Sequence, residues 1–558
     1  MRVKKLSILT QTLSMVHASS LSYIHYSDTL VDSSLSLDKM KASVCKDEFE
    51  LKCAGRMEEG RSLLYQFQED GSLVLPVIDA MQLLGIDYYF QELIGAILER
   101  QYHKIKFLFD ETADLYDTSL RFRLLRQEGY YISPDVFTRF TSEEGKFNEE
   151  LSKDIKGLMA LYEASHLSIQ GEDILEEAAR FSSESLMANM TSLDDCQAII
   201  VKKTLQYPHH KSLAKFTAKI IIENMRFENE WEASLVDLAT MDYSITQSLY
   251  QEEFRQILRW WKGLGLMDEL AKNRQLKWYI WTLALTSDPS MSRERVELTK
   301  PISLVYLIDD IIDVYATFDQ IIQFVDAINR WEISVAEGLP DYMKICLTVL
   351  FDTTNDISNF ILDKYSWNPI DHLKKAWTSL CDAYITEAKW FATGNSPTAD
   401  EYLRNGIMTT GVPMVLSIWF FLLGHGASTE TTDIEDIITS VGAVLRLLDD
   451  LEATQGEKQD GNDASYVEYY VKENQGVSLS DGRQRVMNMV SEQWKLLNKQ
   501  CLSPTPIPTF FRKTCLNVAR MVPMMYNYSD THYLPVLHKQ IMTMFSTING
   551  ESAGLGND

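Results

Sequence analysis

Three carboxylates, those of Asp309, Asp310 and Asp313, lie in the apolar middle of the stretch SLVYLIDDIIDVYATFD, which covers residues 303–319. On a helix, Asp309 and Asp313 are four residues apart and share one face, while Asp310 lies one step round. Ionised carboxylates in an apolar setting need a cationic partner. Oxygen ligands of this kind suit Mg²⁺ or Mn²⁺, and Mg²⁺ commonly bridges to substrate phosphates. The alternatives are a helix N-terminus and a solvated helix face.

A second acidic segment, LRLLDDLEATQGEKQDGNDASY, covers residues 445–466. Asp449 and Glu457 are eight residues apart and share one helical face, with Ala453 between them. Arg446 precedes Asp449 by one turn and is suited to a bidentate contact with phosphate. The glycine-rich residues after Glu457 are typical of a lid loop. Alone, this segment also fits a solvated helix, but the two acidic segments together predict Mg²⁺ ions that clamp a diphosphate.

The segments that position these residues have helical periodicity. Apolar residues recur at spacings of three and four, and no sustained strand-like alternation occurs. We therefore predict an all-α protein with two helical domains. A polar stretch at residues 226–234 marks the boundary. The expected organisation is a leader over 1–45, an N-terminal helical domain over 46–228 and a C-terminal catalytic domain over 229–558.

Charge and composition exclude some classes of function. The 558 residues include 53 Lys and Arg against 79 Asp and Glu, a net charge of −26. So acidic a chain does not favour nucleic acid as a partner, because a basic face supplies most of that affinity. The seven cysteines form no CxxC pair, which favours reduced thiols in an intracellular compartment. The longest apolar run, residues 412–424, is shorter than the about 20 residues of a membrane span, so we expect a core helix and no transmembrane segment.

The first 27 residues contain no acidic residue, eight Ser or Thr, and the basic residues Arg2, Lys4 and Lys5. This composition fits an organelle transit peptide, and the alternative is a disordered tail. A transit peptide predicts a plastid location, and its absence predicts the cytoplasm.

From about residue 50 to 545 the chain resembles plant class I terpene synthases. LIDDIIDVYATFDQ resembles their DDxxD motif, and DDLEATQGE matches (N/D)DxxSxxxE at the first, second and ninth positions. SLRFRLLRQEGYYISPDVFTRF, GLMALYEASHLSIQGEDILEEA and CDAYITEAKWF are similar to further family stretches. The resemblance implies a largely vestigial N-terminal α-barrel, followed by a catalytic helical bundle.

The resemblance also implies roles for individual residues. Three Mg²⁺ ions are expected, with Mn²⁺ as a possible substitute. Asp309 and Asp313 would be direct ligands with Asp310 in support, and Asp449 and Glu457 would hold a third ion. The residues expected at the substrate are Arg446 for the diphosphate, Lys272 and Arg274 in place of an Arg-x-Arg pair, Trp281 as a pocket wall, Thr409 and Thr410 at a helix break, and Tyr526 and Asp530 in a C-terminal lid. For Trp281 the alternative is plain core packing.

Two departures from the family pattern bear on activity. Ala453 stands where the family places a Ser or Thr ligand, and the chain has no Arg-Arg pair. That absence, with the stretches QDGNDASYVEYY and LKWYIW, resembles the subfamily that makes acyclic alcohols. The expected products are linalool from geranyl diphosphate or nerolidol from farnesyl diphosphate. We expect a monomer or weak dimer.

Other classes of function remain as alternatives. A chain-elongating prenyl diphosphate synthase would need a second DDxxD, where this chain has DDLEATQGE. A cyclase that protonates its substrate would need DxDD, which is not found in the sequence. A catalytically impaired synthase, or a helical scaffold without activity, is the remaining alternative, which Ala453 and Lys272 favour.

Overall fold

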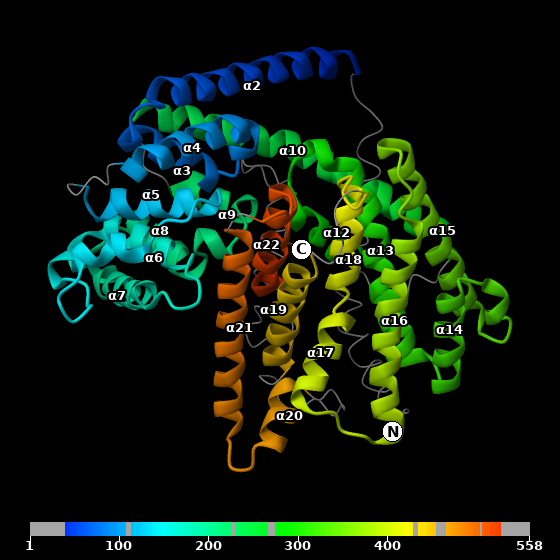
Figure 1. The fold of residues 1–558 in the computed structure, drawn as a ribbon. Helices are drawn as coiled ribbons and strands as arrows, with labels where there is room; N and C mark the ends of the chain where they lie inside the picture. Colours follow the sequence, from blue (N-terminus) through cyan, green and yellow to red (C-terminus); the bar gives the residue numbers. More distant parts are fainter. Residues whose placement is uncertain are drawn as a thin grey trace, which may run out of the picture.

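Helices dominate the computed structural model of this chain (Figure 1). The structure describes residues 39–107, 113–224, 229–265, 274–427, 434–453, 465–502 and 505–525. Within these ranges, the one strand-like pairing is an isolated antiparallel bridge between Thr141 and Phe147. The predicted all-α fold is confirmed.

The N-terminal half is a group of helices mostly at the left of Figure 1, coloured blue through cyan to blue-green, with α2 running across the top. Acidic side chains start several of them: Asp114 accepts the amide of Asp117 at 2.8 Å, and Asp194 accepts that of Gln197 at 3.0 Å. Each cap satisfies an amide that has no partner within the helix. The elements are α2 (Lys39–Phe67), α3 (Gly71–Leu83), η1 (Asp87–Phe90), α4 (Gln91–Phe107), α5 (Leu115–Gln127), η2 (Pro134–Phe140), η3 (Glu149–Lys153), α6 (Ile155–Ser165), α7 (Asp173–Asn189), η4 (Met190–Ser192), α8 (Asp195–Gln206), η5 (His209–Lys211) and α9 (Ala214–Asn224).

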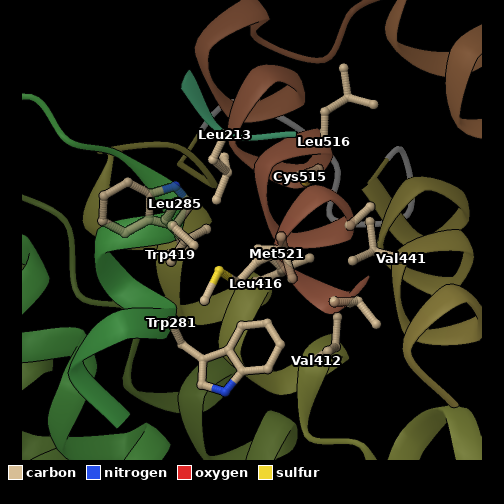
Figure 2. Packing of buried hydrophobic residues seen from close by; sticks show 14 of the residues in the cluster. Leu213, Trp281, Leu285, Val412, Leu416, Trp419, Val441, Cys515, Leu516 and Met521 are labelled. Atoms are coloured by element: carbon tan, nitrogen blue, oxygen red, sulfur yellow. The ribbon is translucent and has the colours of Figure 1, made fainter. Parts of the chain in front are cut away.

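The C-terminal half is a bundle in which α12, α13, α18, α19 and α22 lie around a buried apolar interior (Figures 1 and 2). Its elements are α10 (Glu230–Gly263), α12 (Gln275–Leu285), η6 (Pro289–Met291), α13 (Ser292–Asp310), η7 (Ile311–Tyr315), α14 (Phe318–Arg330), η8 (Ile333–Ala336), α15 (Asp341–Tyr365), α16 (Ile370–Thr393), α17 (Ala399–Thr409), α18 (Val412–Leu422), α19 (Glu435–Ala453), α20 (Tyr466–Glu473), α21 (Leu479–Cys501) and α22 (Thr509–Met525).

A buried ion pair fixes the helix that carries the first acidic motif. Arg295 on α13 and Glu253 on α10 lie 2.6 Å apart, and both side chains are almost completely excluded from solvent. The hydroxyl of Tyr279 on α12 donates to the same carboxylate at 2.7 Å. One glutamate therefore joins α10, α12 and α13, and with them the segments predicted to hold diphosphate and metal.

Buried polar contacts also connect the two halves. The side-chain amide of Asn498 on α21 donates to the carbonyls of His166 and Ser168, at 3.0 and 2.8 Å. Its oxygen lies 2.7 Å from Nε2 of His210, and Arg520 on α22 donates to the His210 carbonyl at 2.7 Å. The bundle is thereby held against the N-terminal helices by hydrogen bonds as well as by apolar packing.

The segment Ala399–Leu422, which consists of α17, the break after it and α18, is long and apolar enough to cross a membrane by length and composition alone. However, 72% of its most apolar window is buried inside the protein, and the core helix of a folded domain passes the same test. Trp419 and Phe420 of α18 are completely buried. The core helix predicted for this apolar run is therefore confirmed.

Candidate active site

The first acidic motif lies where α13 ends. The helix continues regularly to Asp310 and then widens into a π-helical turn, η7, in which the amide of Ala316 donates to the carbonyl of Ile311 at 2.8 Å. A regular α-helix through Asp313, as the spacing predicted, is therefore wrong beyond Asp310. The wider turn leaves Asp309 partly buried and Asp313 exposed. Single π-helical turns of this kind frequently occur at functional sites.

The three carboxylates of this motif have different surroundings. Asp310 is buried and forms an ion pair with Arg274, at the start of α12. Burial and the neighbouring Asp313 raise the pKa of Asp309 to about 8, and the positive charge of Arg446 opposes this rise. Asp309 therefore lies in a position where a further cation would lower the cost of its negative charge. The cationic partner that a buried carboxylate needs is, for Asp310, the guanidinium of Arg274.

The second motif lies on α19, and its arginine connects it to the helix break. Arg446 donates to the Gly406 carbonyl and to the Thr409 hydroxyl, both at 3.1 Å, and lies 3.5 Å from Asp449. Its charge also acts on Asp309, so the two predicted acidic segments do converge.

The second aspartate of this motif, Asp450, also lies near Arg446, at 3.8 Å, and has further partners of its own. Asp450 is buried and accepts hydrogen bonds from the Tyr402 hydroxyl at 3.0 Å and from the Tyr466 amide at 2.8 Å. Because Tyr466 opens α20, the contact ties that helix back to α19.

Sequence reasoning gave no role to Glu387 on α16. Its carboxylate accepts a hydrogen bond from Thr409 at 2.9 Å, so a chain of contacts runs from Arg446 through Thr409 to Glu387. Burial raises the pKa of Glu387, and its charge contributes to the raised pKa of Asp309. The one available signal was an acid inside the family-like stretch CDAYITEAKWF.

Tyr384 lies one turn before Glu387 and was also missed. Its hydroxyl is buried without a hydrogen-bond partner among the described residues, and the charges of Asp309 and Glu387 contribute to its raised pKa. It therefore belongs to the same group of polar side chains.

The predicted helix break is present. α17 ends at Thr409, Gly411 has a φ of +74°, and α18 begins at Val412. The Thr410 hydroxyl donates to the Ile407 carbonyl at 2.6 Å and accepts the Val412 amide at 3.2 Å. Thr409 thus faces Arg446 and Glu387, whereas Thr410 stabilises the break itself.

Trp281 of α12 lies among apolar side chains of the bundle. Figure 2 shows its indole in the same buried group as Val412 and Leu416 of α18 and Met521 of α22. Its ring nitrogen donates to the Tyr306 hydroxyl at 3.0 Å. This position suits both a core residue and the wall of a substrate site.

Four predicted site residues lie outside the residues that the structure describes. These are Lys272, Glu457, Tyr526 and Asp530.

Among the described residues, no three His, Cys, Asp or Glu side chains are grouped so that they could hold a metal ion by themselves. Mg²⁺ does not require such a cage, because it keeps several waters and is commonly held by one or two carboxylates plus substrate phosphates. Asp309 and Asp313 supply two oxygen donors of the right kind, and burial disfavours the negative charge of Asp309 unless a further cation lies beside it. The donor set fits a hard divalent cation.

The comparisons with known proteins agree with this arrangement. Residues 262–496 match the model for the metal binding domain of the terpene synthase family, and residues 26–206 match the N-terminal domain of terpene synthases. A probable terpene synthase of Ricinus communis is 47% identical over 504 residues, which are 88% of this chain and 89% of that protein. The chain belongs to the terpene synthase family.

This terpene synthase is also 44% identical to an (E)-nerolidol synthase of Cannabis sativa over 487 residues, 84% of this chain and 88% of that protein. Among solved structures, isoprene synthase from grey poplar, in complex with three Mg²⁺ ions and dimethylallyl-S-thiolodiphosphate, gives a TM-score of 0.82 at 31% identity. The match covers 89% of this chain and 97% of the poplar enzyme. The two-domain class I architecture and the metal-binding C-terminal domain are confirmed. The substrate class is a prenyl diphosphate.

Proposed function

We propose that this terpene synthase ionises geranyl diphosphate, farnesyl diphosphate or both. Water then adds to the allylic cation, and loss of a proton gives an acyclic tertiary alcohol. The products are linalool from the C10 substrate and nerolidol from the C15 substrate. The observation that carries the ionisation step is the convergence of Asp309, its neighbour Asp313 and Arg446 from two helices. The nerolidol synthase of Cannabis sativa, at 44% identity, supports the alcohol product.

Each group in the site has a proposed part. Asp309 and Asp313 hold Mg²⁺, and Asp449 with Glu457 holds a third ion, as three such ions are bound in the poplar enzyme. When bound, Mg²⁺ supplies Lewis-acid stabilisation of the negative charge on phosphoryl oxygens. Asp310 supports the motif by orienting Arg274.

The basic and apolar residues handle the two ends of the substrate. Arg446, Arg274 and Lys272 bind the diphosphate, and the departing oxygen leaves with both bonding electrons. Trp281 presents an aromatic face to the hydrocarbon, where such a face stabilises a passing cation by about 0.5–2 kcal/mol. Thr410 stabilises the helix break beside it, Thr409 lies there against Arg446, and Tyr526 and Asp530 close the entrance to the site.

The remaining assignments are also proposals. The domain boundary lies at residue 228, and Asn229 starts α10 with a capping box, which supports it. α2 begins at Lys39, inside the proposed leader of residues 1–45. If that leader is a transit peptide, the enzyme works in plastids on the C10 substrate, and otherwise in the cytoplasm on the C15 substrate. We propose a monomer or weak dimer, which analytical ultracentrifugation would test.

Product analysis with both substrates tests the function. Purified enzyme with Mg²⁺ is given geranyl or farnesyl diphosphate in water enriched in ¹⁸O, and volatiles are extracted. The proposal expects linalool and nerolidol that carry ¹⁸O. Cyclic or unlabelled products would overturn the water-capture step. A longer prenyl diphosphate as product would favour a chain-elongating synthase. If neither a terpenoid nor released diphosphate is found, the chain is an impaired synthase or a scaffold.

A further inference from the structure

Tyr306 makes contacts with both ends of the proposed site. It lies on α13, three residues before Asp309 and four before Asp310, and its side chain is partly buried. Its hydroxyl accepts the indole N–H of Trp281 at 3.0 Å. Its ring lies near two cations from the first turn of α12, with the centroid 5.4 Å from the Arg274 guanidinium carbon and 5.4 Å from the Lys277 ammonium.

The hydroxyl of Tyr306 determines how the Trp281 ring is held. Trp281 is 7% exposed, so its N–H has little access to water and needs a partner inside the protein. The aliphatic neighbours shown in Figure 2 provide none. Loss of the hydroxyl would leave that N–H unsatisfied, and the indole would rotate to find another acceptor. The aromatic face presented to the hydrocarbon would change with it.

The ring of Tyr306 has a separate effect on the cations. Arg274 is held by Asp310 on one side and by this aromatic face on the other, and its Nε is buried without a hydrogen-bond partner among the described residues. Lys277 lies one helical turn further along α12, near the same ring. An aromatic face attracts a positive charge without neutralising it, whereas a carboxylate would neutralise it. Both cations are therefore held at the start of α12, on the side of the site where Arg274 meets Asp310.

We infer that Tyr306 is a positioning and specificity-determining residue that connects the two ends of the site, and that Lys277 is a further cation for the substrate diphosphate. The hydroxyl orients Trp281 and so controls the product ratio. The ring holds Arg274 and Lys277 and so controls the binding of substrate. This inference rests on the proposed function.

Two substitutions separate the two effects. Tyr306→Phe keeps the ring and removes the hydroxyl, so we expect the ratio of alcohol to other terpenoids to change about threefold or more, with KM within about twofold of wild type. Tyr306→Leu removes both, so KM rises about tenfold as well. Lys277→Gln leaves α13 unchanged, so we expect it to raise KM without changing the product ratio. This variant takes the place of Tyr306→Leu if Tyr306→Leu does not fold. Tyr102→Phe, in the N-terminal half, is the matched control.

A double-mutant cycle identifies the route of the hydroxyl effect. In a Trp281→Phe background there is no indole N–H, so Tyr306→Phe should cause no further change in product ratio. A further change of the same size would overturn the inference, as would wild-type KM and product ratio in Tyr306→Phe and Lys277→Gln. Wild-type enzyme that makes no terpenoid would overturn the proposed function and this inference together. Wild-type enzyme that makes the alcohol while the variants behave normally would overturn only the inference.

Discussion

Val305 on α13 lies directly against the helix break at Gly411. A Cβ atom placed on Gly411 would lie 2.7 Å from Cγ1 of Val305, closer than real Cβ contacts allow. The φ of Gly411 is also +74°, a conformation that side chains rarely adopt. Since Val305 precedes Tyr306 and Asp309 by one and four residues, this contact fixes the break relative to the first acidic motif.

Gly411→Ala should therefore lower both stability and turnover. We expect a backbone cost of about 1 kcal/mol with a further cost from the displacement of α13, and a fall of at least about tenfold in kcat/KM. Gly394→Ala is the matched control, because Gly394 also has a positive φ but nothing within 4 Å of its added Cβ. Melting temperature and steady-state kinetics measure both effects. Equal behaviour of the two variants would show that the contact with Val305 is unimportant.

The buried pair of Arg295 and Glu253 should dominate the stability of the bundle. Arg295→Met leaves the Glu253 carboxylate buried beside Tyr279 without its cation, so the free energy of unfolding should fall by about 3–5 kcal/mol. Arg259→Met, on the same helix as Glu253, removes an exposed pair with Glu252 and should cost no more than about 1 kcal/mol. Denaturant unfolding of both variants gives the comparison. A small effect of Arg295→Met would mean that water or another cation replaces the guanidinium.

Sequence patterns predicted the features that depend on local spacing. The helical periodicity and the apolar core helix at α18 follow from residues close together in the chain, whereas the break beside Gly411 was expected from the resemblance to terpene synthases. The carboxylate spacing correctly placed Asp309 on α13 but predicted a regular turn to Asp313. The π-helical turn of η7 depends on hydrogen bonding that no spacing rule specifies.

The contacts between distant segments could not be predicted in this way. Asp310 is 36 residues from Arg274, and Thr409 is 22 residues from Glu387, yet each pair is in direct contact. Such pairs follow from how helices pack. The contacts of Tyr306 also depend on helix packing, so the sequence shows Tyr306 only as one more residue of an apolar stretch.

Ala453→Ser tests whether the second motif lacks a metal ligand. Ala453 is the last residue of α19, one turn after Asp449. A hydroxyl there would add an oxygen donor, so the Mg²⁺ concentration for half-maximal activity should fall about three- to tenfold. Ala443→Ser, on the same helix but in its buried part, is the control for the substitution type. An unchanged Mg²⁺ titration of Ala453→Ser would count against a missing ligand.

Acid sensitivity should arise partly from His210. Burial, assisted by the charge of Arg520, lowers the pKa of His210 from 6.5 to about 3. The folded state therefore binds this proton less readily than the unfolded state, and stability is lost as pH falls below about 6.5. As pH falls from 7 to 5.5, this group should lower the free energy of unfolding by about 1 kcal/mol.

The variant His210→Gln cannot titrate, and its amide can still pair with Asn498. Its unfolding midpoint should fall less between these two pH values than that of wild type, whereas replacing the exposed His103 by Gln should change nothing. Parallel pH profiles of wild type and His210→Gln would contradict the assignment.

Mg²⁺-dependent release of diphosphate from geranyl diphosphate tests the central claim most directly. Wild type and Asp363→Ala, an exposed carboxylate on α15, should release diphosphate in proportion to bound Mg²⁺ and stop when a chelator is added. Asp309→Ala should release about a thousandfold less. Its melting temperature without metal should be no lower than that of wild type, because the substitution removes a carboxylate whose charge the fold disfavours. Full release by Asp309→Ala, or release by wild type without a divalent cation, would contradict a reaction driven by metal held at this motif.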